Sequence, residues 1–424
     1  MNFIIENISK SSGRLGKLVH SETGKQFSTP LLLQTTKGGS IPCLSRDVFD
    51  QVTKDDQVLQ MSLATMDHMT DALALYKGKL ADYVGFKNYP NMLTIRDPCE
   101  TMPSGMNDKD MVPLFTRRGK EHLTVRKYMD LVEIFKPDIY QGLCDADTNL
   151  ESSKKRVQKS VDRSTQFMDY CYERHKNSDN LKKTALFAPI VGGYNNYARS
   201  ESIQHALSKT EHIFSGFLFE GFHNYGLSAT EIDLEELLAV MKYSLKELGD
   251  AKPKMMLGAY TPLAILELIS LGVDMFDSSY AYCAAINFKA LIYNFDLSAN
   301  TKTESAFLDL TDEKLKEELK PFIDNCICLT CRKHTRAYVH HLYKTNELLG
   351  PILLMIHNLH HYIGFFETIR SNIAKDSLPQ LVNLIKFQTT ETEIDYHIEQ
   401  NIKKLNKAGL VKVSSKPDLV TNSG

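Results

Sequence analysis

The sequence predicts an α/β fold, a closed (β/α)8 barrel of the TIM type, and three observations point to it. Short apolar runs alternate with longer amphipathic segments from about residue 137 to residue 276. The links between them are short, which favours parallel strands joined by helices. The chain has 424 residues, enough for one large barrel, and a composition that is 42% hydrophobic and 24% charged, which excludes disordered and fibrous classes.

The elements follow from the pattern in chain order. Alternation over 15–19, a polar turn at 21–25 and a run at 27–33 predict a hairpin followed by a buried strand, and thus an N-terminal antiparallel sheet. Further strands are predicted at 139–143, 185–191, 216–219, 255–259 and 273–276. Helices are predicted at about 151–176, 199–208, 234–248 and from Thr261 onward. Gly249 ends the third of these helices and Pro262 begins the fourth.

Charge and hydropathy limit how the chain can interact with nucleic acids and membranes. Lys+Arg total 50 against 52 for Asp+Glu, a net charge of -2, so no global positive field can hold a nucleic acid and any such contact must be a local patch. Basic residues at 117–120 and 154–159 are the candidates. No stretch approaches the roughly 20 apolar residues of a membrane helix and the first residues do not resemble a signal peptide, so we expect a cytoplasmic protein without a transmembrane segment.

A cluster of cysteines predicts a metal site. Cys326, Cys328 and Cys331 crowd into six residues, as in a tetrahedral zinc site that lacks one ligand. His357, after an apolar run, is the favoured fourth ligand. Four other histidines compete for this place: His340, His341, His360 and His361. Four protein ligands would make the single Zn²⁺ structural, and the competing interpretation is that the cysteines are buried apolar thiols.

Acidic residues at the carboxyl ends of the predicted strands are the candidates for chemistry, because barrel enzymes carry their active sites there. Asp145 and Asp147, Glu220, and Asp277 each follow one of the apolar runs. The chain has no Gly-rich phosphate loop followed by a lysine.

The cysteine pattern and its surroundings resemble a known family. Cys326-x-Cys328-x2-Cys331-x25-His357 is similar to the zinc subdomain of the tRNA-guanine transglycosylases. The resemblance continues upstream through segments 272–277, 257–262 and 190–193 and covers about 29 to 375. It implies a C-terminal zinc-binding helical subdomain and raises His357 above its rivals. We place the N-terminal sheet and barrel at 1–320, the zinc-binding subdomain at 321–408 and a polar tail at 409–424.

The resemblance also implies a reaction, the exchange of guanine at the wobble position of tRNA for a deazaguanine base. One aspartate attacks the ribose C1′ and a second moves the proton. Asp277 falls on the first position and Asp97 on the second, while Asp145 falls on an acid that reads the amino edge of the base. Such an exchange needs an anionic nucleophile and a separate acid/base on chemical grounds alone.

Four departures from the family pattern argue against catalysis by this chain. Where the family has Ser-Gly-Gly, this chain has Pro98-Cys99-Glu100, and where the family has Gln-Gly-Gly, it has Val191-Gly192-Gly193. The family's Gly-Gly-Leu is replaced by Glu220-Gly221-Phe222, and its two tRNA-anchoring arginines are replaced by Cys283 and Ile286. These changes remove backbone donors, a side-chain amide and two cations that a base or a phosphate needs. We therefore expect no catalytic residues, and Asp97, Asp145 and Asp277 to be vestigial.

The resemblance then implies an accessory, non-catalytic subunit that forms a heterodimer with a catalytic relative, touches tRNA through the complex and supports queuine insertion there. In the family the dimer interface lies around the zinc subdomain; a homodimer is the alternative when the partner is absent. Two other functions stay open, an active base-exchange enzyme with Asp277 as nucleophile and Asp97 as base, and a zinc-stabilised barrel with a purely protein-binding role. The resemblance also allows peripheral association with the mitochondrial outer membrane.

Overall fold

Parallel strands close into the barrel that the sequence predicts. The computed structural model describes residues 1–9, 13–209, 213–298 and 305–388, and Met1–Gln388 forms one compact unit. The closed sheet runs β10-β11-β12-β13-β4-β5-β6-β9, all neighbours parallel. Its strands are β4 (Leu31–Thr36), β5 (Leu59–Ser62), β6 (Asn91–Thr94), β9 (Ile139–Gln141), β10 (Ala185–Ile190), β11 (Phe214–Phe219), β12 (Lys254–Met256) and β13 (Met275–Asp277). The predicted (β/α)8 fold is confirmed.

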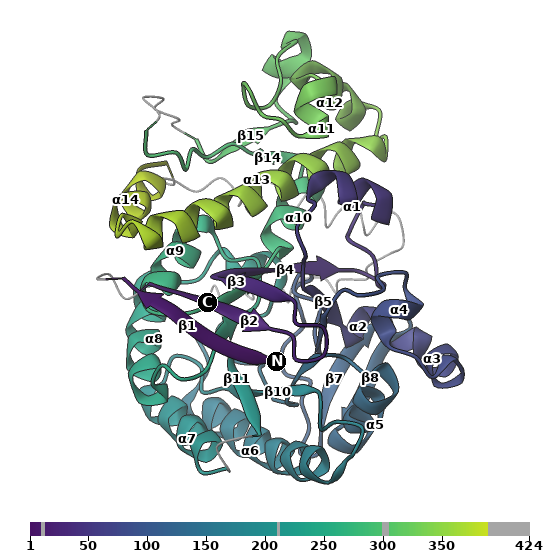
Figure 1. Ribbon diagram of the computed structural model, residues 1–424, viewed down its shortest axis with the longest axis vertical. Coiled ribbons are helices and arrows are strands. Elements are labelled where there is room, and N and C mark those ends of the chain that lie inside the picture. The colour runs from purple at the N-terminus through teal and green to yellow at the C-terminus, as the bar shows by residue number, and fades with distance from the viewer. Residues whose placement is uncertain (10–12, 210–212, 299–304, 389–424) are drawn as a thin grey trace, which may run out of the picture. The chain divides into compact units, whose positions relative to one another are not determined.

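Helices follow the strands and surround the barrel (Figure 1). In chain order they are α1 (Arg46–Val52), α2 (Leu63–Met66), α3 (Thr70–Tyr76), α4 (Leu80–Tyr83), α5 (Val125–Phe135), α6 (Lys154–Asn177), α7 (Asn196–Leu207), α8 (Leu234–Leu248), α9 (Pro262–Ser270) and α10 (Ser279–Ile286). Single turns of 3-10 helix occur at Asp67–Met69, Gly226–Ala229 and Glu313–Glu317.

The helix ends have the local causes that the sequence suggests. The Ser153 side chain accepts a hydrogen bond from the Arg156 amide and so starts α6 three residues after the predicted start at 151. Thr261 caps α9 in the same way, with Pro262 in its first turn. Gly249, at φ 66°, ends α8 because a left-handed residue there favours glycine.

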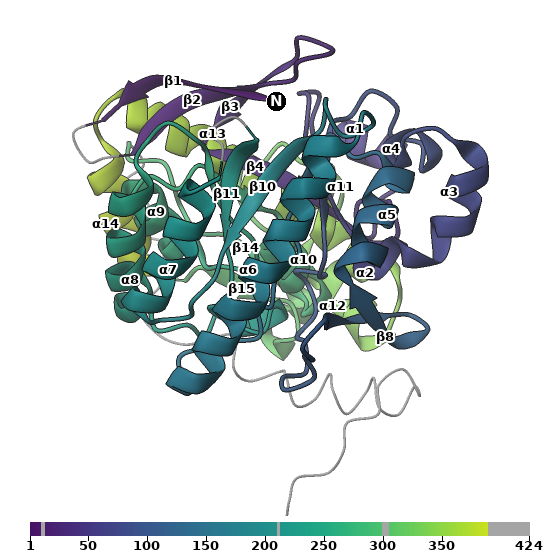
Figure 2. The same ribbon diagram turned by 90° about the horizontal axis from the view of Figure 1, so that it is seen from below.

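The N-terminal antiparallel sheet covers one end of the barrel (Figure 2). It consists of β1 (Asn2–Ile8), β2 (Arg14–Val19) and β3 (Gln26–Thr29). The single buried strand predicted at 27–33 is wrong, since β3 belongs to this sheet and β4 to the barrel. Pro30, which has no N–H to donate, separates the two. Leu18 and Phe27 pack into the core at the amino ends of the barrel strands.

The remaining hairpins and helices complete the unit. A hairpin of β7 (Met111–Thr116) and β8 (Gly119–Thr124) follows β6, and β14 (Lys289–Leu291) pairs with β15 (Phe307–Asp309). A helical region of α11 (Leu329–Lys333), α12 (Arg336–Lys344), α13 (Leu349–Ala374) and α14 (Leu378–Gln388) contains the cysteine cluster, as predicted (Figure 1). The boundaries at residues 320 and 408 stay predictions, and residues 389–424, with the predicted tail, lie outside the described part of the chain.

None of the described helices combines the length and the apolar character needed to cross a membrane. The cytoplasmic location and the peripheral association with the mitochondrial outer membrane stay predictions.

Candidate functional site

The three aspartates singled out in the sequence lie at the carboxyl ends of barrel strands. Asp97 follows β6, Asp145 follows β9, and Asp277 ends β13. All three are buried, with relative exposures of 3%, 0% and 1%. Buried carboxylates are costly unless they are paired or hydrogen-bonded, so their partners decide what they can do.

Asp277 accepts hydrogen bonds from the main chain. Its Oδ2 lies 2.7 Å from the amide nitrogen of Gly258, and its Oδ1 lies 2.8 Å from that of Ser279. Burial raises the pKa of Asp277, although these hydrogen bonds oppose the shift, and the neighbouring charge of Asp97 raises it further. Both oxygens are thus engaged in joining β13 to the loop after β12 and to the start of α10.

Asp97 is paired with a lysine. Lys37 Nζ lies 2.8 Å from Asp97 Oδ2 and 2.5 Å from Glu100 Oε1, and it also lies 5.5 Å from the centre of the Tyr282 ring. Burial alone would lower the pKa of Lys37, but the carboxylates of Asp97 and Glu100 raise it strongly. Asp97 Oδ1 accepts a hydrogen bond from the Cys99 amide at 2.9 Å. An acid held this way is a poor proton shuttle, because its charge is already neutralised.

Asp145 is held by two arginines of α6. Arg156 binds both carboxylate oxygens, with Nη1 at 3.0 Å from Oδ2 and Nη2 on Oδ1, and Arg163 Nη1 lies 2.9 Å from Oδ2. The Asp147 amide adds a weaker bond to Oδ1 at 3.3 Å. Arg156 belongs to a candidate RNA-contacting patch on this helix; its guanidinium is paired with Asp145 and its side chain is 23% exposed, so RNA contact by this residue stays a prediction.

Arg96, Tyr225 and Gln141, which were not candidates in the sequence, lie at the same end of the barrel as Glu220. Arg96, 6% exposed, donates from Nη2 to the Cys144 carbonyl at 3.1 Å. Tyr225 donates its hydroxyl to the buried Glu220 carboxylate, and Gln141 Nε2 lies 3.4 Å from the same group. Burial raises the pKa of Glu220, against the opposing charge of Arg96. The position of Arg96 in the sequence could have identified it, because a long cationic side chain there follows an apolar strand and directly precedes Asp97.

A second arginine, Arg199, links the carboxyl ends of β10 and β11. Arg199 is fully buried and donates to the carbonyls of Ile190, Gly193 and Glu220 at 2.5, 2.9 and 2.8 Å. Its guanidinium carbon lies 3.9 Å from the centre of the Phe222 ring. The Arg199 side chain and the Phe222 ring thus fill the space beside Gly192-Gly193 and Gly221.

The departures from the family pattern have structural counterparts. Val191 is buried in an apolar cluster with Cys144 and Val157. Cys283 is buried on α10, with Sγ 3.8 Å from the Cys99 carbonyl, whereas Ile286 is 38% exposed. The cavity at this end of the barrel, bordered by Arg96 and Tyr225, has a volume of about 20 Å³, enough for about one water molecule. Pockets for small molecules usually measure about 300 Å³ or more.

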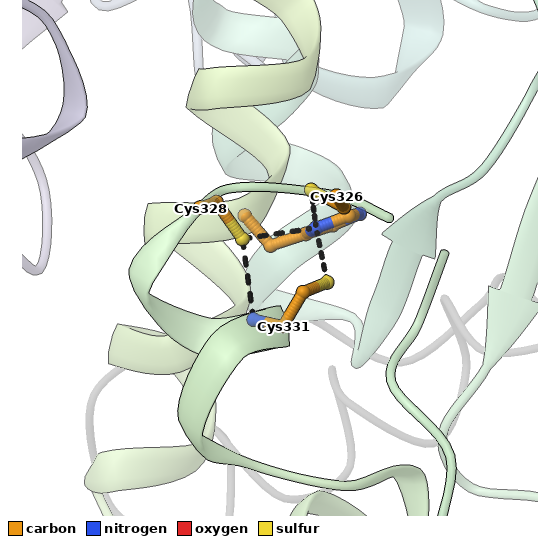
Figure 3. Close-up of side chains that lie close together, drawn as sticks. Cys326, Cys328 and Cys331 are labelled. Atoms are coloured by element: carbon orange, nitrogen blue, oxygen red, sulfur yellow. Dashed lines mark hydrogen bonds between the residues drawn. The ribbon is translucent and has the colours of Figure 1, made fainter. Parts of the chain in front are cut away.

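The predicted metal ligands come together in the helical region (Figure 3). The Sγ atoms of Cys326, Cys328 and Cys331 lie 3.9, 3.5 and 3.3 Å from His357 Nδ1, and all four ligand atoms lie within 4.8 Å of one another. Cys328 also caps α11, with its Sγ 3.3 Å from the Cys331 amide. A tetrahedral zinc ion separates such N and S ligands by about 3.5 Å.

The surroundings of His357 fit a metal ligand. Its ring is fully buried, and Nε2 lies 2.9 Å from the Leu291 carbonyl, which leaves Nδ1 directed at the thiols. Two of the alternative histidines are engaged with main-chain carbonyls: His340 Nδ1 lies 2.9 Å from the Leu310 carbonyl, and His361, whose ring stacks on His357, has Nε2 3.0 Å from the Tyr293 carbonyl. The cluster of Cys326, Cys328, Cys331 and His357 could therefore bind a metal ion such as zinc.

Comparisons with known proteins show the family to which the chain belongs. A family model described as queuine tRNA-ribosyltransferase matches residues 9–390. The "Queuine tRNA-ribosyltransferase accessory subunit 2" of Drosophila mojavensis is 55% identical over 412 residues, 97% of this chain and 98% of that relative. The protein of the same name from Drosophila melanogaster is 57% identical over 417 residues, with the same coverage of both chains. The chain therefore belongs to the queuine tRNA-ribosyltransferase family.

Proposed function

We propose that this chain is the non-catalytic accessory subunit of a heterodimeric queuine tRNA-ribosyltransferase. It pairs with a catalytic relative, helps to hold the tRNA and stabilises the complex that exchanges guanine for queuine. The relatives that share more than half of its residues over nearly their whole length carry the name accessory subunit.

One observation carries the proposal: each acid that the reaction would need is engaged inside the chain. Lys37 neutralises Asp97, two arginines bind Asp145, and main-chain amides bind both oxygens of Asp277. A nucleophile needs a free oxygen beside a sugar, whereas each oxygen of Asp277 already accepts a hydrogen bond from the main chain. This arrangement favours the accessory role over the active base-exchange enzyme that uses Asp277 and Asp97.

The Cys3His cluster supports one structural Zn²⁺ per chain. Four protein ligands leave no open position for substrate, so the ion would stabilise the fold and take no part in chemistry. His357 lies on α13, and its Nε2 contacts the carbonyl of Leu291 in β14. A bound ion would thus join α11 and α13, with β14 packed behind the histidine.

The zinc-binding region also offers a surface for the catalytic partner. Leu319, Ile327 and Leu348 are 79%, 72% and 83% exposed and lie close in the sequence to the cysteine cluster. Tyr338 and Leu349 in the same region are each 38% exposed. Exposed aromatic and aliphatic side chains are typical anchors of protein interfaces, so we assign this surface, residues 319–349, to the heterodimer.

Contacts with tRNA would come from local basic patches, since the net charge is close to zero. Lys154, Lys155 and Lys159 are exposed on α6, and Arg117 and Lys120 are exposed at the β7–β8 hairpin. The first turn of α6 and this hairpin both follow carboxyl ends of barrel strands, which favours a shared surface at that end.

The proposal is tested by an exchange assay with labelled guanine or queuine and tRNA. The purified chain alone, a catalytic relative alone and the two together are compared, with the mass of the complex and its zinc content measured in parallel. We expect a one-to-one complex and exchange only when the catalytic relative is present. Exchange by this chain alone would refute the proposal, and a complex that forms without touching tRNA would favour the purely protein-binding role.

A further inference from the structure

An exposed aromatic ring lies in the first turn of α7, next to the basic start of α6. Tyr197 is 69% exposed. Within the described parts of the chain, its side chain makes no hydrogen bond, ring contact or contact with a cation. The ring therefore offers a flat apolar face and a polar hydroxyl to a binding partner.

Contacts between the two helices place this ring beside a lysine. Helices α6 and α7 lie side by side (Figure 1), and Gln158 Nε2 of α6 lies 3.0 Å from Glu201 Oε2 of α7. Lys154 precedes Gln158 by one helical turn, and Tyr197 precedes Glu201 by one turn. Because the outer helices of a (β/α)8 barrel run in the same direction, Lys154 and Tyr197 lie in neighbouring first turns.

The backbone under the ring is fixed by the fold. The Asn195 side chain accepts a hydrogen bond from the Ala198 amide at 3.0 Å and so caps α7. Ala198 and Arg199 are both buried, and Ala198 packs in one apolar cluster with Val157 of α6. Tyr197 itself has only two side-chain torsions, so holding its ring against a ligand costs little conformational entropy.

The charge beside the ring is positive. Lys154, Lys155 and Lys159 are exposed on α6, and Glu151 is the one acid between residues 151 and 159. Exposed cations next to an exposed aromatic ring are typical of proteins that bind single-stranded nucleic acids, because the cations contact phosphates and the ring stacks on an unpaired base. A duplex offers no such base, since its bases stack on one another.

We propose that Tyr197 stacks on an unpaired base of the tRNA, while Lys154 and Lys155 contact the phosphates on either side of that base. This inference rests on the proposed function, because tRNA binding is part of the accessory role. It adds that this surface recognises a single-stranded loop of the tRNA and not a helical stem. Base identity matters little there, since every base has a flat face for the ring.

The test measures tRNA binding by the intact heterodimer of this chain and its catalytic relative. Tyr197→Ala is compared with Tyr197→Trp, which keeps a stacking ring, and with Tyr76→Ala, a control at a tyrosine of α3 that is 49% exposed. The mass and zinc content of each complex are measured in parallel. We expect Tyr197→Ala to raise the Kd for tRNA about fivefold or more, and the other two variants to stay within about twofold of the unchanged complex.

A salt titration separates the ring from the lysines. Lys154→Met should lower the slope of log Kd against log salt concentration by about one, because one phosphate contact is lost. Tyr197→Ala should leave that slope unchanged, since stacking releases no counterions. With RNA competitors of equal length, Tyr197→Ala should lose affinity for a single strand and keep its affinity for a duplex.

The contrary results separate this inference from the proposed function. If Lys154→Met weakens tRNA binding and Tyr197→Ala does not, the stacking is refuted and the tRNA contact stands. If neither variant changes tRNA binding and ultraviolet light crosslinks no tRNA to this chain, both fail. The stacking is also refuted if Tyr197→Ala weakens duplex binding as much as single-strand binding, or if its heterodimer dissociates into subunits.

Discussion

Replacing Arg156 by Met should destabilise the chain through Asp145. Arg156 makes two hydrogen bonds to a carboxylate that is fully buried. Removing one partner of a buried ion pair costs about 3–5 kcal/mol, because the other charge stays buried. Arg163 and the Asp147 amide remain at 2.9 and 3.3 Å, so some compensation stays. We expect the free energy of unfolding to fall by about 2–4 kcal/mol.

Denaturant unfolding followed by circular dichroism measures this change. Lys155→Met is the matched control, since Lys155 is the neighbouring residue on α6 but exposed. Its effect on stability should stay within about 0.5 kcal/mol, while its effect on tRNA binding should exceed that of Arg156→Met. If Arg156→Met were as stable as the control, or weakened tRNA binding more than Lys155→Met does, the inward pairing of Arg156 would be refuted.

The remaining predictions concern the metal, the partner and pH. Cys331→Ser should reduce the zinc content from one ion per chain to none and lower the Tm by several degrees, whereas the exposed Cys43→Ser should change neither; equal zinc content in both variants would count against the site. Leu348→Glu should weaken the heterodimer at least tenfold in sedimentation or calorimetric titrations, whereas Leu75→Glu, also at a position 83% exposed, should not; the reverse would move the interface to α3. Burial lowers the pKa of His175 from 6.5 to about 4, so its contribution to stability is complete above pH 6.5 and is lost as the pH falls toward 4. The stability advantage of the wild type over His175→Gln should therefore shrink by about 3 kcal/mol across that window, and parallel pH profiles would refute the shift.

The fold and the metal ligands could be predicted because their signals are local. From residue 137 onward, strands and helices can be told apart by the spacing of apolar residues and by the residues that cap helices. Each segment shows these signals without reference to the rest of the chain. Three thiols within six residues show a shared site in the same way. Pro30 was an equally local signal, and the strand predicted at 27–33 was wrong because the chain passes at Pro30 from β3 of the N-terminal sheet to β4 of the barrel.

The partners of the acids could not be predicted, because they depend on closure of the barrel. Lys37 directly follows β4 and Asp97 follows β6, so these two partners are far apart in the sequence and meet only in the closed barrel. Arg156 was interpreted as surface charge because the sequence does not show that this face of α6 points at the end of β9. Arg96 was overlooked because a charged residue beside a strand end is usually solvated, whereas here Tyr225 covers it.

If the chemistry belongs to the other subunit, a reciprocal substitution in the two subunits will show it. One complex contains this chain with Asp277→Asn and an intact catalytic relative; the other contains this chain unchanged and a relative whose own nucleophilic aspartate is replaced by asparagine. Guanine exchange into tRNA is measured for both. We expect the first complex to keep its rate within about twofold and the second to lose at least about a thousandfold. Loss of exchange in the first complex, with its assembly and zinc content intact, would contradict the account.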